Sequence, residues 1–355
     1  MAVDGVDPVR GAGGTAGRRR PTLRDVASAA GVSPKTVSRV VNKEPGVSPA
    51  LAGRVEKAVT KLGFRPHPGA STLRRADRRS GTIALLVENV ANPFSAVLLR
   101  AVEDVATTHR SVVLAASLDE QPERERELAA LFANRRVDGM IIVPASEDQS
   151  HLARETAEGT PLVFVDRAAR GLSADSVVTT NESGAAEAVR HLASYGHRRI
   201  AYLGDRTGIL TARDRLAGYR AALRGLGIPV DPALVAGDLT DTGAADGAAT
   251  MMLTSKDPPT AFFTAQNLVT IGAIRALRRL GLHRQVAVVG FDDFPLADLL
   301  DPAVTVVAQD VATIGRLAAR RLFERLDGDT SPHRLELVPT QLVRRGSGEV
   351  APPGT

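Results

Sequence analysis

TLRDVASAAGVSPKTVSRVVN, residues 22–42, holds two short helical patterns separated by a glycine. Apolar residues at three- and four-residue spacing predict a first helix that ends at Gly31, because glycine readily adopts the left-handed conformation of a helix end. Ser33 followed by Pro34 is typical of the start of a second helix. A third apolar stripe covers residues 48–62. Two short helices joined by a tight turn and followed by a third predict a helix-turn-helix module.

The same string closely resembles the DNA-binding head of the LacI/GalR family of bacterial transcriptional regulators. The resemblance implies that the second helix, residues 34–42, lies in the major groove of DNA. It implies base contacts by Pro34, Lys35 and Arg39; Arg39 suits guanine because a guanidinium can donate to both O6 and N7. The side chains expected to bind phosphates are Thr22, Ser33, Thr36, Asn42 and Ser48. For the two serines, a role as helix caps alone stays open.

Charge is distributed unevenly along the chain. Residues 1–80 contain 16 Lys and Arg against 6 Asp and Glu, a net charge of +10, whereas residues 81–355 contain 29 against 34, a net charge of −5. A basic head on an acidic body favours a polyanion-binding module joined to a second unit, and the alternative is a solvated basic tail. We expect residues 1–20 to form a disordered arm and residues 21–65 to form the helix-turn-helix domain.

Residues 66–80 are rich in Pro, Gly, Ser and Arg, which is typical of a linker. In the family that the head resembles, this position is a hinge that contacts the minor groove of the operator. The resemblance implies that Leu73 inserts between base pairs, with Ala70 and Arg74 beside it. Without the resemblance, an isolated leucine in a basic linker would indicate no function.

From Thr82 onward, short apolar runs alternate with amphipathic helical stretches, a pattern that predicts parallel sheets covered on both faces. The expected strands lie at 82–87, 111–117, 138–143, 161–166, 198–204, 260–265 and 286–293, and the expected helices at 95–109, 123–136, 184–195, 212–226, 267–281 and 310–326. The predicted architecture is an all-α helix-turn-helix head followed by an α/β body of two lobes.

The body resembles the periplasmic-binding-protein-like (type I) effector domain of the same family. Motifs that carry this resemblance are NPF at 92–94, VDR ending at Arg167, GHRRIAYL at 196–203, GFDD at 290–293 and PTQLVRRGS at 339–347. The resemblance implies an effector-binding and dimerisation domain over 81–347 and a tail over 348–355. Within it, lobe one is expected at 81–195 and 309–327, and lobe two at 196–308 and 334–345.

A two-lobed α/β body is expected to bind its ligand between the lobes, at the carboxyl ends of the strands. The effector-binding residues that the resemblance implies are Asn92, Phe94, Asp166, Arg167, Arg215, Asn267 and Asp292. Two alternatives stay open: Arg215 can belong to a solvated helix face, and Asp292 can cap the turn that follows it.

The expected cleft departs from the family pattern at two places. Thr180-Asn181 and Gln266-Asn267 stand where many relatives carry a pair that includes a carboxylate. An arginine left without its carboxylate would favour an anionic ligand, such as a sugar phosphate or a sugar acid, because a buried unpaired charge is costly. The alternative is that Asp166 pairs with an arginine inside the protein and that the ligand is a neutral sugar or nucleoside.

Several function classes lack their signatures. Cysteine is absent, which excludes disulfides, thiolate zinc sites and cysteine nucleophiles. No G-x-S-x-G, Walker A or H-E-x-x-H motif occurs, and adjacent carboxylates such as Asp292 and Asp293 usually point apart. An enzyme and a solute-binding transport component are the alternatives; against the second, residues 1–17 lack the apolar core of a signal peptide.

We therefore expect a cytoplasmic transcriptional regulator, a repressor, that binds a pseudo-palindromic operator in double-stranded DNA. The recognition helix reads only a few base pairs, so a homodimer, with a tetramer as a further possibility, is expected to supply two heads. A sugar or a sugar derivative is the expected effector. No catalytic residue, cofactor or metal is expected, and no apolar run approaches the ~18 residues that a membrane-spanning helix needs.

Overall fold

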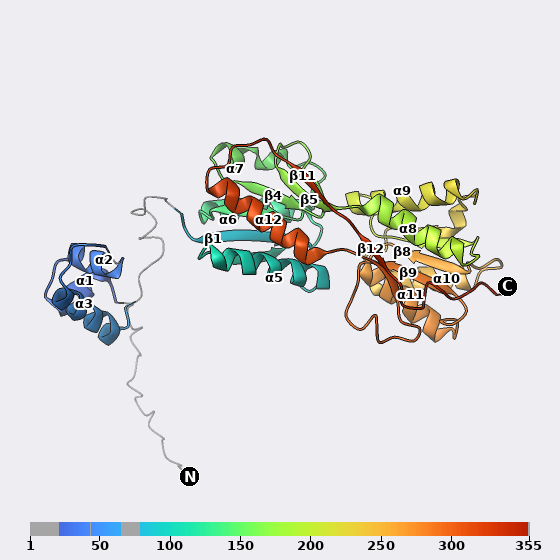
Figure 1. Cartoon of the computed structure of the whole chain (residues 1–355), viewed down its shortest axis with the longest axis horizontal. Helices are drawn as coiled ribbons and strands as arrows, with labels where there is room; N and C mark the ends of the chain where they lie inside the picture. Colours follow the sequence, from blue (N-terminus) through green and yellow to red (C-terminus); the bar gives the residue numbers. More distant parts are fainter. Residues whose placement is uncertain (1–20, 43, 65–78, 354–355) are drawn as a thin grey trace, which may run out of the picture. The chain divides into compact units, whose positions relative to one another are not determined.

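The computed structural model describes residues 21–42, 44–64 and 79–353. The chain divides between Ser80 and Gly81 into a small amino-terminal head and a larger body, which are described separately (Figure 1). The expected arm at 1–20 and most of the expected hinge at 66–80 lie outside the described residues. No helix in the described part is long and apolar enough to cross a membrane.

The head consists of α1 (Leu23–Ala30), α2 (Pro34–Val41) and α3 (Pro49–Leu62), which confirms the three predicted helices. Thr22 and Asp25 form the reciprocal hydrogen bonds of a capping box at the start of α1, and Gly31 ends this helix with a φ of 62°. Arg54 on α3 donates from Nη2 to the backbone oxygen of Ala30 at 2.6 Å and so ties α3 to the turn between α1 and α2. The three helices enclose a core of small apolar side chains with one phenylalanine: Val26, Ala27, Ala30, Val37, Val55, Ala58 and Phe64.

The first lobe contains a six-stranded parallel sheet. In sheet order its strands are β11 (Leu335–Val338), β5 (Asp175–Thr179), β4 (Leu162–Val165), β3 (Gly139–Ile142), β1 (Thr82–Val87) and β2 (Val112–Ser117). Helices α5 (Pro93–Thr108) and α12 (Val311–Leu326) pack against each other and cover one face, whereas α6 (Pro122–Asn134) and α7 (Ala153–Ala157) belong to the other side (Figure 1). The central strands are buried on both faces, as their continuous apolar runs predicted.

The second lobe contains a six-stranded sheet with the corresponding strand order. Its strands are β12 (Gln341–Val343), β10 (Thr305–Ala308), β9 (Ala287–Phe291), β8 (Ala261–Thr264), β6 (Ile200–Leu203) and β7 (Val235–Ala236), with β12 antiparallel to β10. Helices α8 (Asn181–Ser194) and α9 (Leu210–Gly225) pack on one face, and α10 (Thr242–Leu253) and α11 (Asn267–Arg279) pack on the other. Each strand of one sheet therefore has a counterpart in the other sheet.

Two expected lobe boundaries are wrong. Helix α8 packs against α9 and the second sheet, so the first lobe ends near residue 180 and not at residue 195. Strand β11 pairs with β5 in the first sheet, although the second lobe was expected to begin again at residue 334. The chain passes between the lobes after β5, after β10 and after β11. The expected bounds were those that the resemblance implies, and β5, β10, β11 and β12, which are short or partly exposed, were not among the expected strands.

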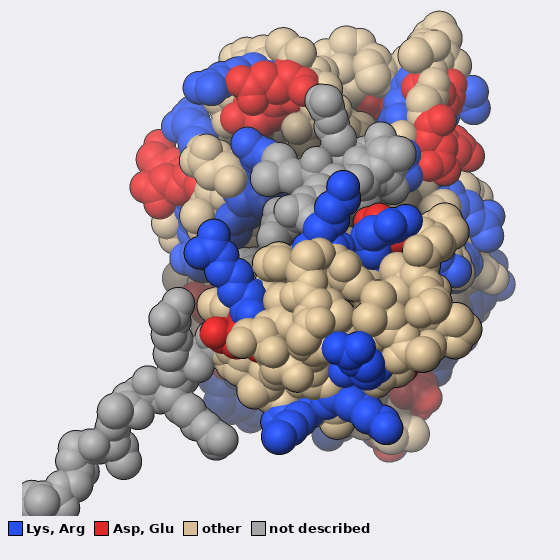
Figure 2. All heavy atoms as spheres, turned by 90° about the vertical axis from the view of Figure 1, so that its left-hand side faces the viewer, with Lys and Arg blue, Asp and Glu red and all other residues tan. Residues whose placement is uncertain are grey.

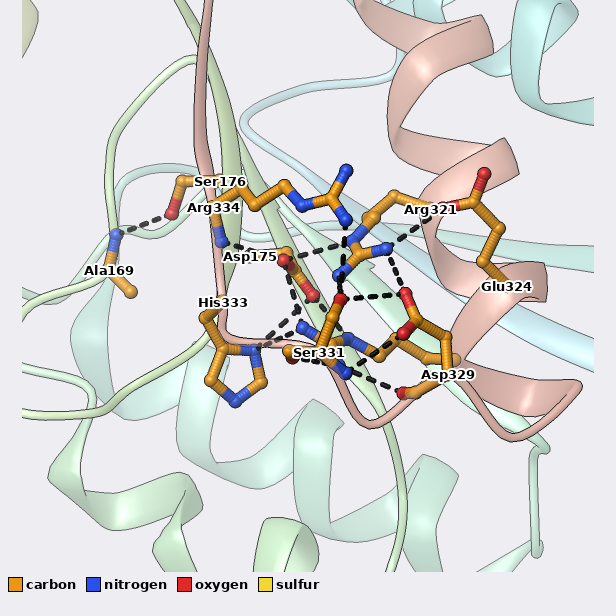
Figure 3. Close-up of polar contacts among 10 residues, drawn as sticks. Ala169, Asp175, Ser176, Arg321, Glu324, Asp329, Ser331, His333 and Arg334 are labelled. Atoms are coloured by element: carbon orange, nitrogen blue, oxygen red, sulfur yellow. Dashed lines mark hydrogen bonds and ion pairs between the residues drawn. The ribbon is translucent and has the colours of Figure 1, made fainter.

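A buried carboxylate fixes β11 and α12 to the edge of the first sheet (Figure 3). Asp175, at the start of β5, is 1% exposed and accepts a hydrogen bond from Arg325 Nε at 2.7 Å. Arg321 Nε lies 3.0 Å from the same carboxylate, and the backbone amide of Arg334 donates to it at 2.9 Å. These partners, with His333, outweigh the effect of burial and lower the pKa of Asp175 to about 2.

Residues 348–353 pack against the second lobe, although the sequence suggested a tail over 348–355. His197 is fully buried and joins Thr260 Oγ1 at 2.9 Å to the backbone oxygen of Val350 at 2.7 Å. Glu349 accepts a hydrogen bond from Thr305 Oγ1 at 2.9 Å. These contacts give His197, the histidine of the GHRRIAYL motif, a structural role.

Candidate nucleic-acid interface and ligand-binding cleft

The start of α2 presents the expected base-contacting residues to solvent. The Ser33 hydroxyl accepts a hydrogen bond from Thr36 N at 3.1 Å, and Pro34 occupies the first turn, where its missing N–H costs nothing. Pro34 and Lys35 are exposed. Figure 2 shows the head from one side, with Lys and Arg side chains around its margin and little acidic surface. This surface has the charge that phosphate binding requires.

Arg39, the third expected base-contacting residue, bends toward the loop that follows α2. Its Nη2 donates to the backbone oxygen of Pro45 at 2.7 Å, and its Nε lies 3.7 Å from a carboxylate oxygen of Glu44. Both Arg39 and Glu44 are substantially exposed, so the ion pair is weak in water. A guanine that accepts two hydrogen bonds from Arg39 would have to replace these contacts.

The expected phosphate-binding side chains make local hydrogen bonds in the head. Thr22 belongs to the capping box, and the hydroxyls of Ser33 and Thr36 lie 2.9 Å apart. Asn42 donates from Nδ2 to Ser38 Oγ at 3.3 Å. Ser48 occupies the N-cap position of α3 without a capping hydrogen bond from its side chain. The expected minor-groove residues Ala70, Leu73 and Arg74 lie outside the described residues.

A narrow cavity of about 40 Å³ lies between the lobes of the body, where the strands of both sheets end. It contains six of the seven residues expected to bind the effector: Asn92, Phe94, Asp166, Arg167, Arg215 and Asp292. The seventh, Asn267, does not line the cavity. It is 2% exposed and donates from Nδ2 to Asn92 Oδ1 at 3.0 Å, so it joins the two lobes beside the cavity.

Arg215 on α9 is held on several sides and does not belong to a solvated helix face. It is 5% exposed, and its guanidinium stacks 3.8 Å from the ring centre of Phe291. Its Nε donates to Asn181 Oδ1 at 2.8 Å, and its Nη1 donates to Ala265 O at 2.8 Å and to Asp292 Oδ2 at 3.2 Å. The premise that this arginine lacks a carboxylate partner is therefore wrong.

Arg167 is also neutralised inside the protein. Its two terminal nitrogens donate to the carboxylate of Glu120 at 2.7 and 2.5 Å, a bidentate pair that the sequence analysis did not identify. Nη1 also donates to Pro144 O at 2.7 Å, and Nε lies 3.5 Å from Asp166 Oδ2. Arg167 thus connects the loops that follow β2, β3 and β4. Both arginines of the cleft therefore already face carboxylates, and neither needs an anionic ligand as a partner.

Asp166 and Asp292 occupy equivalent positions in the two lobes. Asp166 follows β4 with a φ of 65°, and Asp292 follows β9 with a φ of 69°. The backbone amide of Asp166 donates to Val177 O at 3.1 Å, and that of Asp292 donates to Val307 O at 2.9 Å. This left-handed backbone turns each carboxylate toward the cleft at the end of its strand. The bond to Arg215 also shows that Asp292 does more than cap a turn.

Two further carboxylates line the cavity, Glu88 and Asp205, which were not among the expected effector-binding residues. Glu88 follows β1 and Asp205 lies just beyond β6, the counterpart of β1 in the second lobe. Burial and the nearby Glu120 raise the pKa of Glu88 to about 7, and burial raises the pKa of Asp205. The rule that ligands bind at the carboxyl ends of parallel strands already pointed to both positions.

The two lobes meet closely around the cavity. Besides the bond between Asn92 and Asn267, Arg213 on α9 lies 3.2 Å from Glu147 of the first lobe. No group of three or more His, Asp or Glu side chains within 21–42, 44–64 and 79–353 could hold a metal ion. The geometry suits a ligand that is recognised by hydrogen bonds from both lobes.

Comparisons with known proteins agree with this architecture. Residues 22–67 match the model of bacterial regulatory proteins of the lacI family, and residues 189–348 match that of the periplasmic binding protein-like domain. The HTH-type transcriptional repressor CytR of Escherichia coli (strain K12) is 32% identical over 93% of this chain and 97% of its own length. The HTH-type transcriptional regulator CelR of Thermobifida fusca is 36% identical over 93% of this chain and 99% of its own length.

Solved structures are similar over the same extent. The Lac repressor dimer bound to operator and the anti-inducer ONPF has a TM-score of 0.81 and 28% identity, covering 94% of this chain and 100% of that one. The complex of the transcriptional regulator CelR with cellobiose has a TM-score of 0.69 and 31% identity, covering 92% of this chain and 100% of that one.

Proposed function

This chain belongs to the LacI family of bacterial regulatory proteins, and from that premise we propose that it is a repressor that binds a pseudo-palindromic operator as a dimer and responds to a sugar-like effector in the interlobe cavity. The observation that carries the proposal is the pairing of a basic helix-turn-helix head with a two-lobed body whose cavity is lined by polar groups from both lobes. It acts in the cytoplasm as a binding protein and not as an enzyme.

The head supports operator binding through α2. Pro34 and Lys35 stand exposed at its start, and Arg39 contacts the following loop through one hydrogen bond to Pro45 O and an exposed ion pair. In the proposed complex Arg39 exchanges these contacts for a guanine, and Leu73 widens the minor groove between the two half-sites. The side chains of Thr22, Ser33, Thr36, Asn42 and Ser48 fix the register on the phosphates.

The body supports dimerisation and control. Large apolar side chains are exposed on α5 and β2 in the first lobe and beyond β9 in the second: Val97, Val112, Leu296 and Leu299. Burial of such surface between two copies would stabilise the dimer.

A ligand that prefers one arrangement of the lobes shifts the population of that arrangement. By linkage, operator DNA must then change the affinity for the ligand by the same factor.

Selection of binding sites from random double-stranded DNA tests the proposal. We expect full-length protein to enrich two inverted half-sites, with a guanine at a fixed place in each. Arg39→Ala should lose that guanine preference at a cost of about 1–3 kcal/mol per site. Leu73→Ala should retain the half-sites but bend the DNA less in a circular-permutation assay. Enrichment of an asymmetric site by a monomer would overturn the proposal.

The effector is to be found by passing cell extract over the immobilised protein and identifying the retained molecule by mass spectrometry. That molecule should change operator affinity, and operator DNA should change its affinity by an equal factor. Equal ligand affinity with and without operator would overturn the regulatory part of the proposal.

A further inference from the structure

Two buried polar atoms at the interlobe cavity have no partner among the described residues. Ser95 on α5 is 2% exposed, and its hydroxyl makes no hydrogen bond. Gln309 donates from Nε2 to Asp292 Oδ1 at 2.6 Å, which leaves Gln309 Oε1 without a donor. Both residues line the cavity. An unsatisfied buried polar atom costs free energy, so a ligand that supplies donors here would be favoured.

Glu88 and Asp205 add two carboxylates that form no ion pair with any described residue. Glu88 accepts only a long hydrogen bond of 3.4 Å from Asn92 Nδ2, and Asp205 accepts one of 3.3 Å from Gln266 Nε2 and one from the neighbouring amide of Arg206. One carboxylate comes from each lobe, and both line the cavity as well as a neighbouring pocket.

The cavity is therefore acidic and rich in acceptors. Glu88, Asp166, Asp205 and Asp292 line it, against Arg167 and Arg215. Arg215 already pairs with Asp292, and Arg167 pairs with Glu120 beyond the cavity wall. The arginines thus leave little positive charge for a ligand. The carboxylates would repel an anionic ligand. A neutral hydroxyl group is a poor match as well, because each donor hydrogen comes with an acceptor oxygen and the cavity is already rich in acceptors.

From this arrangement we propose that the effector carries a basic nitrogen and that its ammonium group binds between Glu88 and Asp205. An ammonium offers three donors and no acceptor, and its charge offsets the two carboxylates. The remaining hydroxyls of an amino sugar or a cyclic imino sugar would reach Ser95 Oγ and Gln309 Oε1. The proposal deepens the proposed function, on which it rests for the cavity as the effector site.

Calorimetry on the full-length protein with matched ligands tests it. The pairs are D-glucose with D-glucosamine, D-galactose with D-galactosamine, and 1,5-anhydroglucitol with 1-deoxynojirimycin, with D-glucuronate as the anionic member. We expect the basic member of at least one pair to bind at least ten times more tightly than its neutral partner, and glucuronate not to bind. Equal or weaker binding of every basic member, or no binding in the whole panel, overturns the proposal.

Two variants test whether the ammonium group of the ligand binds between Glu88 and Asp205. Glu88→Gln and Asp205→Asn should each reduce the preference for the basic member at least tenfold, whereas Glu127→Gln, an exposed acid on α6, should leave it unchanged. Circular dichroism is expected to show that all three variants fold. An unaltered preference in both cleft variants would overturn the assignment. Thermal stabilisation by magnesium or calcium chloride alone that disappears in Glu88→Gln would overturn it in favour of a cation site.

Different results would overturn the basic nitrogen of the effector and the proposed control of operator binding. If an amino sugar binds through Glu88 but does not change operator affinity in a gel-shift titration, control through this cavity is wrong and the ligand class stands. If a neutral sugar releases the operator and no basic partner binds more tightly, control stands and the basic nitrogen is wrong.

Discussion

The two lobes have corresponding strand orders, but they secure their outer strands with different chemistry. In the first lobe, the loop before β11 and the helix α12 are joined to β5 by buried charges around Asp175. In the second lobe, the segment after β12 is held by Ser347, whose Oγ donates to Val288 O at 2.6 Å and accepts from Thr305 N at 2.9 Å, and by the Glu349 carboxylate, which accepts from Thr305 Oγ1 at 2.9 Å. The first lobe thus holds its edge with a carboxylate between two arginines, and the second lobe with a hydroxyl and a carboxylate that bonds a hydroxyl.

The strand ends facing the cleft show the opposite relation, because there the lobes are alike. Each lobe contributes a carboxylate after its β1-type strand and another after its β4-type strand. The sheet edges can differ because any set of contacts that holds the last strand in place is enough to keep the fold. Strand ends are constrained by a shared ligand, which both lobes must contact at once.

The largest effect is expected from Asp175→Asn in the first lobe. Removal of this carboxylate leaves Arg321, which is 4% exposed, with only the less buried Asp329 and Glu324 as partners, so the expected cost is about 3 kcal/mol, at the lower end of the range for breaking a buried pair. Urea unfolding should show the loss, and hydrogen exchange should place it in β5, β11 and α12. The matched control is Asp293→Asn in the second lobe, where an exposed pair with Arg345 should contribute under about 1 kcal/mol.

The difference in stability between wild type and Asp175→Asn should also depend on pH, with a sign that follows from the pKa of Asp175. The folded state lowers the pKa of Asp175 to about 2, so its contribution is present above the ordinary pKa near 4 and is lost as the pH falls toward 2. Wild type and Asp175→Asn should therefore converge in stability in acid. A constant difference between them from pH 7 to pH 2 would contradict the role of the ionised carboxylate.

A smaller effect, of opposite sign, is expected from Glu88→Gln. Glu88 faces Glu120, Asp166 and Asp205, with Arg167 the opposing charge, and its pKa rises from 4.5 to about 7. Because the folded state holds the proton more tightly, the stability from Glu88 is present below pH 4.5 and is lost as the pH rises through 7. The loss is about 2 kcal/mol, since a side chain in partial contact with solvent realises less than its full shift.

Thermal unfolding midpoints from pH 4.5 to pH 8 measure this effect. The midpoint of the wild type should fall relative to that of Glu88→Gln as the pH rises, and a saturating basic ligand should reduce the difference. Parallel profiles for the two proteins would show that the Glu88 carboxylate titrates as in water.

Residue patterns predicted the head and the central strands because caps and buried apolar runs are local signals. The end of α1 at Gly31, the start of α2 at Ser33 and Pro34, and the strand at 82–87 were all placed correctly. The edge strands were missed because β11 alternates between exposed and partly buried residues and takes its place only through the long-range pairing with β5. Lobe membership follows from such pairings, and the lobe bounds that the family resemblance implied misplaced α8.

Family resemblance placed six expected effector residues around one cavity, but it did not give their partners. The bond of Arg167 to Glu120 joins residues 47 positions apart, and that of Arg215 to Asp292 joins residues 77 positions apart. Those contacts depend on how the loops close over the strand ends. For this reason the charge balance of the cleft was predicted incorrectly, whereas its location was predicted well.

The smallest effect tests whether the lobes are linked symmetrically. Asn92 of the first lobe and Asn267 of the second share one hydrogen bond of 3.0 Å, but Asn92 Oδ1 also accepts from Phe94 N at 3.1 Å and so caps α5. Asn92→Ala should therefore cost more stability than Asn267→Ala, by about 1 kcal/mol, because it removes a helix cap as well as the link. A double-mutant cycle isolates the link itself, with an expected coupling of about 0.5–1.5 kcal/mol. Equal single costs with no coupling would show that the amides do not join the lobes in solution, and the contrast between the two lobes would then be confined to their edges.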